Sequence, residues 1–194
     1  MNILITGGLG HIGSYIISSI NKIKKLDNIY IIDNNSNNRI NSIFNYNKKK
    51  IKLIIDDLCD KNSFKSVKHK INIILHLASI TDAESSLKNI KKVYINNYKS
   101  FLNVINFAKK NNSKLIHISS TSIYGSMEET VDENCRELKP QSPYAEVKFL
   151  EEKFLKKTSN LSFITLRFGT IVGYSKGMRF HTAVNKFCYN SIIG

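Results

Sequence analysis

The chain of 194 residues is 42% hydrophobic, which is enough for one substantial core and excludes wholesale disorder. No apolar run reaches the roughly 18 residues of a membrane span, and the N-terminus reads as a strand and not as a signal peptide, so we expect a soluble cytoplasmic protein. The formal net charge of +14 comes from lysines spread along the chain, as at Lys48–Lys50 and Lys91–Lys92, without the sustained basic stripe of a dedicated nucleic-acid-binding protein.

A short apolar strand at residues 2–6 runs into a glycine-rich turn, followed by an apolar helical pattern over 11–25. Glycines stand at positions 7, 10 and 13. In this spacing the first permits a tight turn, the second lets backbone approach a pyrophosphate, and the third allows close packing of helix on strand. The alternative is a glycine-rich turn without a ligand. Its place between a strand and a helix favours a dinucleotide site.

A second strand, predicted over 28–32, ends at Asp33, about twenty residues beyond Gly13. A carboxylate there is placed to accept hydrogen bonds from the adenosine ribose hydroxyls and would repel the extra phosphate of NADP. Asp33 therefore favours NAD as the cofactor. The alternative is an ordinary turn aspartate, since a polar run at 34–38 follows it.

The remainder of the chain alternates between strand and helix patterns, which is typical of a parallel sheet covered on both faces. Right-handed crossovers then predict a doubly wound, Rossmann-type α/β fold of strand order 3-2-1-4-5-6, with the ligand at the carboxyl ends of the strands. Further strands are expected near 51–55, 72–76, 114–119 and 162–167, and further helices near 61–69, 84–110 and 143–158.

The cysteines and histidines show no metal-ligand or disulfide spacing. Cys59, Cys135 and Cys188 are far apart and odd in number, which indicates free thiols in a reducing compartment. His76 ends a predicted strand and His117 lies inside another, so we expect both to be packed residues and predict no metal site.

Tyr144 and Lys148 are four residues apart on a predicted helix and so project from one face. An ammonium group beside a phenol stabilises the phenolate, which suits Tyr144 to act as a general base or acid. Alone the pattern is weakly specific, because Tyr-x-x-x-Lys arises often by chance. Its position downstream of the glycine-rich turn makes it informative.

Seven segments in order resemble motifs of the extended short-chain dehydrogenase/reductase family, the NAD-dependent sugar-nucleotide epimerases and dehydratases. Asp56 departs from the family's Gly-Asp-Leu motif, and Ser100-Phe101 replaces a usual Gly-Thr. The matching segments are Thr6–Gly13, Asp56–Leu58, His76–Ser79, Tyr94–Asn97, Ser119–Gly125, Pro140–Lys148 and Leu166–Gly173.

The resemblance implies a Ser-Tyr-Lys triad of Ser120, Tyr144 and Lys148 acting on a nucleotide-sugar through a transient keto intermediate. Dehydratases of the family carry Asp-Glu directly after the serine position, where this chain has Thr121-Ser122, so an epimerase or simple reductase is favoured over a 4,6-dehydratase. The cofactor residues that it implies, besides Tyr144 and Lys148, are Gly7, Gly10, His11, Ile12, Gly13, Asp33, Asp57, Leu58, Ala78 and Asn97.

The resemblance also predicts the domain organisation. Residues 1–177 are expected to form the NAD-binding domain, and 178–194 to begin a substrate domain that is truncated, leaving Phe180, Val184, Phe187 and Ile192 exposed. A full-length homodimer through the helices near 84–110 and 143–158 is also implied. A non-catalytic NAD sensor or scaffold on the same fold is the alternative, against which an intact Ser120, Tyr144 and Lys148 argue.

Overall fold

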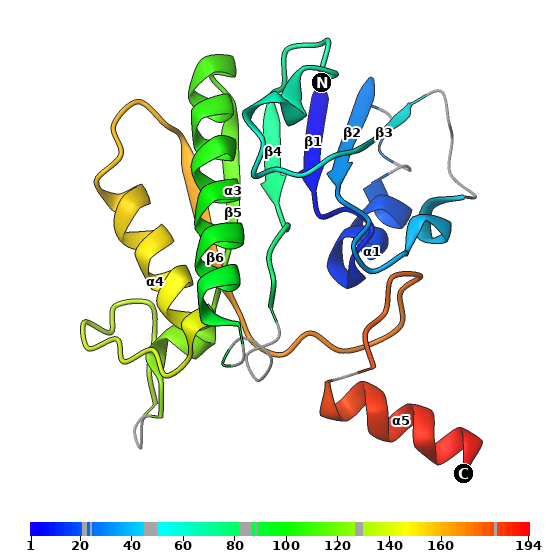
Figure 1. Ribbon diagram of the computed structural model, residues 1–194, viewed down its shortest axis with the longest axis vertical. Helices are drawn as coiled ribbons and strands as arrows, with labels where there is room; N and C mark the ends of the chain where they lie inside the picture. Colours follow the sequence, from blue (N-terminus) through cyan, green and yellow to red (C-terminus); the bar gives the residue numbers. More distant parts are fainter. Residues whose placement is uncertain are drawn as a thin grey trace.

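The computed structural model describes residues 1–20, 23, 25–44, 50–81, 87, 89–126, 130–180 and 182–194. One six-stranded parallel sheet runs through the molecule in the order β3-β2-β1-β4-β5-β6, which confirms the predicted order (Figure 1). Its strands are β1 (Asn2–Thr6), β2 (Asn28–Asp33), β3 (Ile51–Ile55), β4 (Ile73–His76), β5 (Lys114–Ser120) and β6 (Phe163–Phe168).

The connections between the strands contain α-helices and short 3-10 helices. The α-helices are α1 (His11–Ile20), α3 (Ile90–Asn111), α4 (Pro143–Lys156) and α5 (Ala183–Ile193). The 3-10 helices are η1 (Ile40–Ile43), η2 (Lys61–Phe64) and η3 (Thr121–Tyr124). Across the described residues, none of the helices is both long enough and apolar enough to cross a membrane.

Two helix predictions differ from the structure. In place of the helix expected over 61–69, the structure has only the 3-10 helix η2. The Asp60 side chain caps its start by accepting a hydrogen bond from the Asn62 backbone, and η2 ends at Phe64, which is buried. Within the helix expected over 84–110, Leu87 is helical, and α3 begins at Ile90, after Asn89, whose backbone is non-helical with φ of −137°. Residues 82–86 and 88 of that prediction lie outside the described residues, as do 21, 22 and 24 of the helix expected over 11–25.

Alternate side chains of β1 pack against opposite layers of helices. Leu4 belongs to a cluster with Phe101 and Val104 of α3, whereas Ile3 and Ile5 pack with Ile17 of α1. All but Ile3 are less than 1% exposed, and burying one such side chain stabilises the fold by roughly 1.5–3 kcal/mol. The alternation holds helices against both faces of the sheet, as a doubly wound fold requires.

The covering of the sheet is incomplete at the β6 edge, where the prediction of two covered faces is only partly met. Ile164 and Leu166 remain 43% and 39% exposed. After β6 the chain does not return across this face: it runs toward the glycine-rich turn and ends in α5, apart from the sheet (Figure 1). Phe163, on the opposite face of the same strand, packs against the α3 and α4 layer.

Helix α4 is fixed at both its beginning and its middle. The Ser142 side chain caps the helix by accepting a hydrogen bond from Ala145 N at 3.2 Å, and Pro143 occupies the first turn, where no intrahelical donor is needed. Glu152 then accepts two hydrogen bonds from Arg167 of β6, at 3.0 and 2.7 Å. These contacts fix the helix that carries Tyr144 and Lys148 against β5 and β6.

Candidate functional site

A cleft of about 610 Å³ lies at the carboxyl ends of β1, β2, β3 and β4. Parallel sheets of this order bind ligands at that edge, where strands lead into loops on opposite sides. Of the residues predicted to hold a cofactor, those lining the cleft are Gly7, Gly10, Asp33, Asp57, Leu58 and Ala78. The described residues that line the cleft do not include four others predicted to hold the cofactor: His11, Ile12, Gly13 and Asn97.

The glycine-rich turn has the geometry that its spacing predicts. Gly7 has φ of +68°, and a Cβ on it would lie 2.7 Å from the Ala78 backbone, so the loop after β4 can approach only a glycine. A Cβ on Gly13 would lie 2.6 Å from the Gly8 Cα, which lets α1 pack directly on the turn. Gly10 differs, since among the described residues a Cβ on it would have one neighbour within 4 Å, Gly7 O at 3.3 Å. The side of Gly10 that would carry a Cβ faces the cleft, whose wall Gly10 helps to form.

Asp33 stabilises the turn as well as lining the cleft. One carboxylate oxygen accepts a hydrogen bond from Leu9 N at 3.0 Å and the other from Asn35 N at 2.8 Å. Each carboxylate oxygen retains capacity for a further donor. Asp57 has a similar position at the end of β3, where its side chain accepts a hydrogen bond from Cys59 N.

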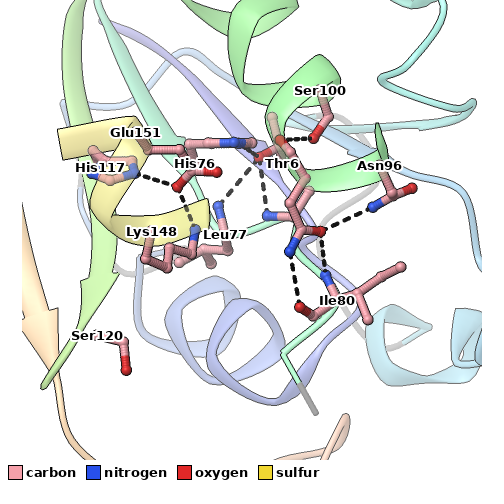
Figure 2. Close-up of polar contacts among 12 residues, drawn as sticks. Thr6, His76, Leu77, Ile80, Asn96, Ser100, His117, Ser120, Lys148 and Glu151 are labelled. Atoms are coloured by element: carbon pink, nitrogen blue, oxygen red, sulfur yellow. Dashed lines mark hydrogen bonds and ion pairs between the residues drawn. The ribbon is translucent and has the colours of Figure 1, made fainter. Parts of the chain in front are cut away.

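The loop after β4 is held by polar side chains from β1 and α3 (Figure 2). Thr6 Oγ1 accepts hydrogen bonds from Leu77 N at 3.2 Å and Ala78 N at 3.3 Å, so its hydroxyl proton is free to be donated to His76 Nδ1 at 2.7 Å. Asn97 accepts from Ile80 N at 2.8 Å and donates to Ile80 O at 3.0 Å. Asn97 therefore shapes the cleft wall through the loop and not by lining the cleft.

Several residues at the cleft were not identified from the sequence. Arg39 and Arg179 line it, and Arg39 Nη1 donates to Gly177 O at 3.0 Å while Arg179 Nη1 donates to Thr81 Oγ1. Both contacts link the cleft to the segment after β6. The same segment contacts α1, because Gly177 N donates a hydrogen bond to Ser14 Oγ at 2.8 Å. A contact across 163 residues leaves no periodic signal in the sequence. Arg39 could have been noticed as the cation after the polar run at 34–38.

Two members of the predicted triad share the face of α4. Tyr144 is half-buried, Lys148 is 3% exposed, and Lys148 Nζ lies 6.0 Å from the centroid of the Tyr144 ring. Ser120 ends β5 next to this helix and stands apart from Lys148 in Figure 2. Its Oγ accepts hydrogen bonds from Ser122 N at 3.2 Å and Ser122 Oγ at 2.8 Å. The three residues lie beyond the end of the lined cleft.

Lys148 has a carboxylate partner that was missed. Lys148 Nζ donates to Glu151 Oε2 at 2.8 Å, and His117 Nε2 donates to the same oxygen at 2.9 Å (Figure 2). Burial would raise the pKa of Glu151, yet the two donors hold it at about 2. His76 and His117 are buried, as expected, and burial lowers the pKa of both imidazoles, that of His76 to about 3. The (i, i+3) spacing of Lys148 and Glu151 could have indicated the pair.

The segment beyond residue 177 carries the exposed apolar side chains that were expected. Phe180 and Val184 are each 50% exposed, Phe187 68% and Ile192 85%. Phe180 contacts Tyr189 with ring centroids 4.8 Å apart. A second, more apolar cleft of about 900 Å³ lies between this segment and residues 172–178, away from Tyr144 and Lys148.

A glycine-rich strand-to-helix turn, an acid after the second strand and a cleft at the carboxyl edge together define a dinucleotide-binding domain of the Rossmann type. The chain belongs to the NAD-dependent epimerase/dehydratase family, whose model matches residues 3–192. Membership confirms the family predicted from the motifs and supports NAD as the cofactor.

Curated relatives include both reaction classes of the family. The chain is 29% identical over 184 residues to UDP-glucose 4-epimerase of Yersinia enterocolitica, covering 89% of this chain and 54% of the relative. It is 30% identical over 161 residues to human dTDP-D-glucose 4,6-dehydratase, covering 79% and 45%. The chain thus spans about half the length of these relatives.

Solved structures share the same arrangement. A UDP-N-acetylglucosamine 4-epimerase from Methanobrevibacter ruminantium M1, in complex with UDP-N-acetylmuramic acid, superposes with a TM-score of 0.87 at 27% identity over 100% of this chain and 63% of that one. UDP-glucose 4-epimerase from Thermus thermophilus, in complex with NAD, gives 0.73 at 24% identity over 86% and 54%, which shows a common fold.

The residues of the cleft fit a dinucleotide. The open side of Gly10 leaves room for a group that approaches the backbone, and the N-terminus of α1 offers partial positive charge to a pyrophosphate. Asp33 lines the same cleft beside the turn, with unused acceptor capacity for ribose hydroxyls. The mixed lining of cations and carboxylates suits a ligand with both phosphate and ribose groups.

Proposed function

We propose that this chain binds NAD in the cleft and belongs to an enzyme that epimerises a nucleotide-sugar through a transient keto intermediate. The observation that carries the proposal is the joint occurrence of the Gly7–Gly13 cradle, Asp33 and a Tyr144–Lys148 pair along one edge of the sheet. Cofactor and sugar would lie end to end along that edge, with the nicotinamide toward α4.

In this proposal the chain's own residues handle the proton and the alignment. The Tyr144 phenolate removes a proton from a sugar hydroxyl, and the Ser120 hydroxyl donates a hydrogen bond to the same oxygen. The Lys148 ammonium stabilises the phenolate and holds the nicotinamide ribose. NAD, when bound, accepts the hydride that leaves the sugar carbon and returns it.

Return of hydride to the opposite face of the ketone gives the epimer. The alternative within the family is dehydration, which requires an acid and a base next to Ser120. The residues in that position are Thr121 and Ser122, neither of which is ionisable near neutral pH. This supports epimerisation or simple reduction over 4,6-dehydration.

We also propose that residues 178–194 begin the domain that binds the sugar nucleotide and that the full-length protein is a homodimer. The exposed apolar side chains of 178–194 support the first statement. Helices α3 and α4 lie together on one face of the sheet and present exposed Ile90, Ile95 and Leu150, which supports the second (Figure 1).

The experiment that tests the function is calorimetric titration with NAD and NADP, followed by turnover assays with UDP- and dTDP-hexoses. We expect the 194-residue chain to bind NAD, and turnover to require the chain extended by its downstream coding sequence. In the extended protein, Tyr144→Phe should keep NAD binding and lose nearly all turnover. Tyr94→Phe is the matched control. It also removes a tyrosine hydroxyl that contacts α4, through a hydrogen bond to Glu146, but Tyr94 has no proposed role in proton transfer.

NAD binding without turnover in the extended protein would favour the alternative of a sensor or scaffold. No heat with either cofactor would contradict the proposal altogether. Full activity in Tyr144→Phe would exclude this tyrosine as the base.

A further inference from the structure

Glu151 is a fully buried carboxylate one turn beyond the lysine of the proposed triad. Glu151 and His117 are both 0% exposed and Lys148 is 3% exposed. A single oxygen of Glu151 accepts from Lys148 Nζ at 2.8 Å and from His117 Nε2 at 2.9 Å. Because a carboxylate can only accept, His117 carries a proton on Nε2, and burial lowers the pKa of the imidazole, which favours its neutral form.

Glu151 makes the largest favourable contribution to the charge of the buried Lys148. Taken by itself, burial lowers the pKa of the Lys148 ammonium, because a charged group loses its hydration. The contact with Glu151 is the largest opposing influence, followed by Tyr144, and the pKa of Lys148 is raised overall. The titratable and charged groups that face this region are Tyr144, Glu151 and Glu152 of α4, His117 of β5 and His76 of β4.

The neighbouring Glu152 has a smaller effect on the pKa of Lys148 than Glu151 or Tyr144 has, and its hydrogen bonds go elsewhere. Its two carboxylate oxygens accept hydrogen bonds from Arg167 Nε and Nη2, so it joins α4 to β6. Within the described part of the chain, the Glu151 carboxylate makes no such link to β6 and instead accepts from Lys148 of its own helix and from His117 of β5. Two adjacent buried glutamates of one helix therefore serve different purposes.

We propose that Glu151 is a positioning residue for Lys148, holding its ammonium group charged and in place beside Tyr144 for the cofactor ribose. The proposal rests on the proposed function for the part played by the cofactor. One of the three ammonium protons is committed to Glu151, which leaves the other two for a ribose hydroxyl and for the side of Tyr144. His117 holds the second side of the shared oxygen, so that the carboxylate cannot rotate freely away.

Removal of the charge at Glu151 should take away the largest influence that opposes burial at Lys148, leaving the weaker effects of Tyr144 and Glu152. Glu151→Gln is of the same shape but carries no charge, so Lys148 would lose its proton at a pH below its ordinary value near 10.4. A neutral Lys148 neither stabilises the Tyr144 phenolate nor donates as strongly to a ribose. Glu152→Gln is the matched control, since it removes the adjacent carboxylate and leaves the Lys148 contact in place.

The first test is the titration of Lys148 by NMR, observed at its ¹³C-labelled Cε and assigned with Lys148→Met. We expect Lys148 to stay charged beyond pH of about 10.4 in the unaltered chain and in Glu152→Gln, and to titrate at lower pH in Glu151→Gln. Titration of Lys148 below that value in the unaltered chain would overturn the proposal. So would equal titration in the two variants. The first of these outcomes does not depend on whether either glutamate variant folds.

The second test is NAD affinity between pH of about 7 and 9.5 by calorimetry. Glu151→Gln should weaken binding about tenfold or more, increasingly so as pH rises and Lys148 is deprotonated, whereas Glu152→Gln should show no such pH dependence. Glu151→Asp, which keeps the charge, should recover most of the affinity. If affinity in Glu151→Gln equalled that in Glu152→Gln at every pH, Glu151 would have only a structural role. If the unaltered chain bound no NAD, the proposed function would fail while the NMR titration still decided the role of Glu151.

Discussion

Three glycines of this chain should respond differently to the same added methyl group. Gly7 has φ of +68°, and a new Cβ would lie 2.7 Å from both Ala78 Cα and Ala78 N. The left-handed backbone costs about 1–3 kcal/mol for alanine, and overlap with a packed backbone costs about 1–3 kcal/mol more. We therefore expect Gly7→Ala to lower the free energy of unfolding by about 2–6 kcal/mol.

Gly173 and Gly10 separate the two contributions. Gly173 has φ of +106° with no described residue within 4 Å of its Cβ position, so Gly173→Ala should cost only the backbone part, about 1–3 kcal/mol. At Gly10, within the part of the chain that the structure describes, a Cβ would meet only Gly7 O at 3.3 Å, so Gly10→Ala should cost less than about 1 kcal/mol in stability. Its methyl group would instead face the cleft and weaken NAD binding by roughly tenfold or more.

The assay combines urea unfolding with calorimetric titration of NAD for all three variants. With a urea slope of roughly 2 kcal/mol per molar, Gly7→Ala should lower the unfolding midpoint by about 1 M or more. Gly10→Ala should leave the midpoint nearly unchanged and bind NAD poorly. A Gly10→Ala chain that bound NAD as the unaltered chain does would refute the placement of the pyrophosphate at this turn. Equal loss of stability at Gly7 and Gly173 would refute the close approach of the loop after β4.

Three further outcomes are expected. The unaltered chain should bind NAD more tightly than NADP in calorimetric titration, and equal affinities would contradict the role of Asp33. Asp33→Ala should reduce the ratio of NAD affinity to NADP affinity. It should also weaken NAD binding itself, since Asp33 accepts a hydrogen bond from Leu9 N of the glycine-rich turn. Lys148→Met in the extended protein should reduce both turnover and NAD affinity, whereas Tyr144→Phe should reduce turnover alone; steady-state kinetics and titration distinguish them. Stability should fall in acid, as urea midpoints measured from pH of about 7 to 3 can show. The folded pKa of His76 is about 3, below its ordinary 6.5, so its contribution is present above pH 6.5 and is lost as pH falls toward 3. The folded pKa of Glu151 is about 2, below its ordinary 4.5, so its contribution to stability is likewise lost as the pH falls below 4.5. A urea midpoint that rose on acidification would contradict the predicted direction of this pH dependence.

Local patterns determined most of the fold and part of the site. The alternation of short apolar strands with helices was enough for the sheet order, because parallel strands with right-handed crossovers allow few arrangements. Gly7 was found from the glycine spacing and Asp33 from its position after the second strand, whereas Asp57 and Ala78 were implied only by the family resemblance; the ends of these parallel strands meet at one edge of the sheet. The pairing of Tyr144 with Lys148 followed from helical spacing alone.

Other features depend on contacts between distant segments, which a local pattern does not contain. The short η2 replaces the helix expected over 61–69, since burial of Phe64 and the Asp60 cap decide the turn more than propensity does. The contact of Gly177 with Ser14 joins residues 163 positions apart.

The surroundings of Lys148 show the same division. The sequence by itself determined that Lys148 lies one helical turn from Tyr144, because that spacing is a property of any α-helix. Only the tertiary structure decided that His117 of β5 would meet Glu151 of α4, 34 residues away, and leave Lys148 with a buried carboxylate partner. The charge of a buried amine depends on what the packed core places beside it, and that is settled only when sheet and helix come together.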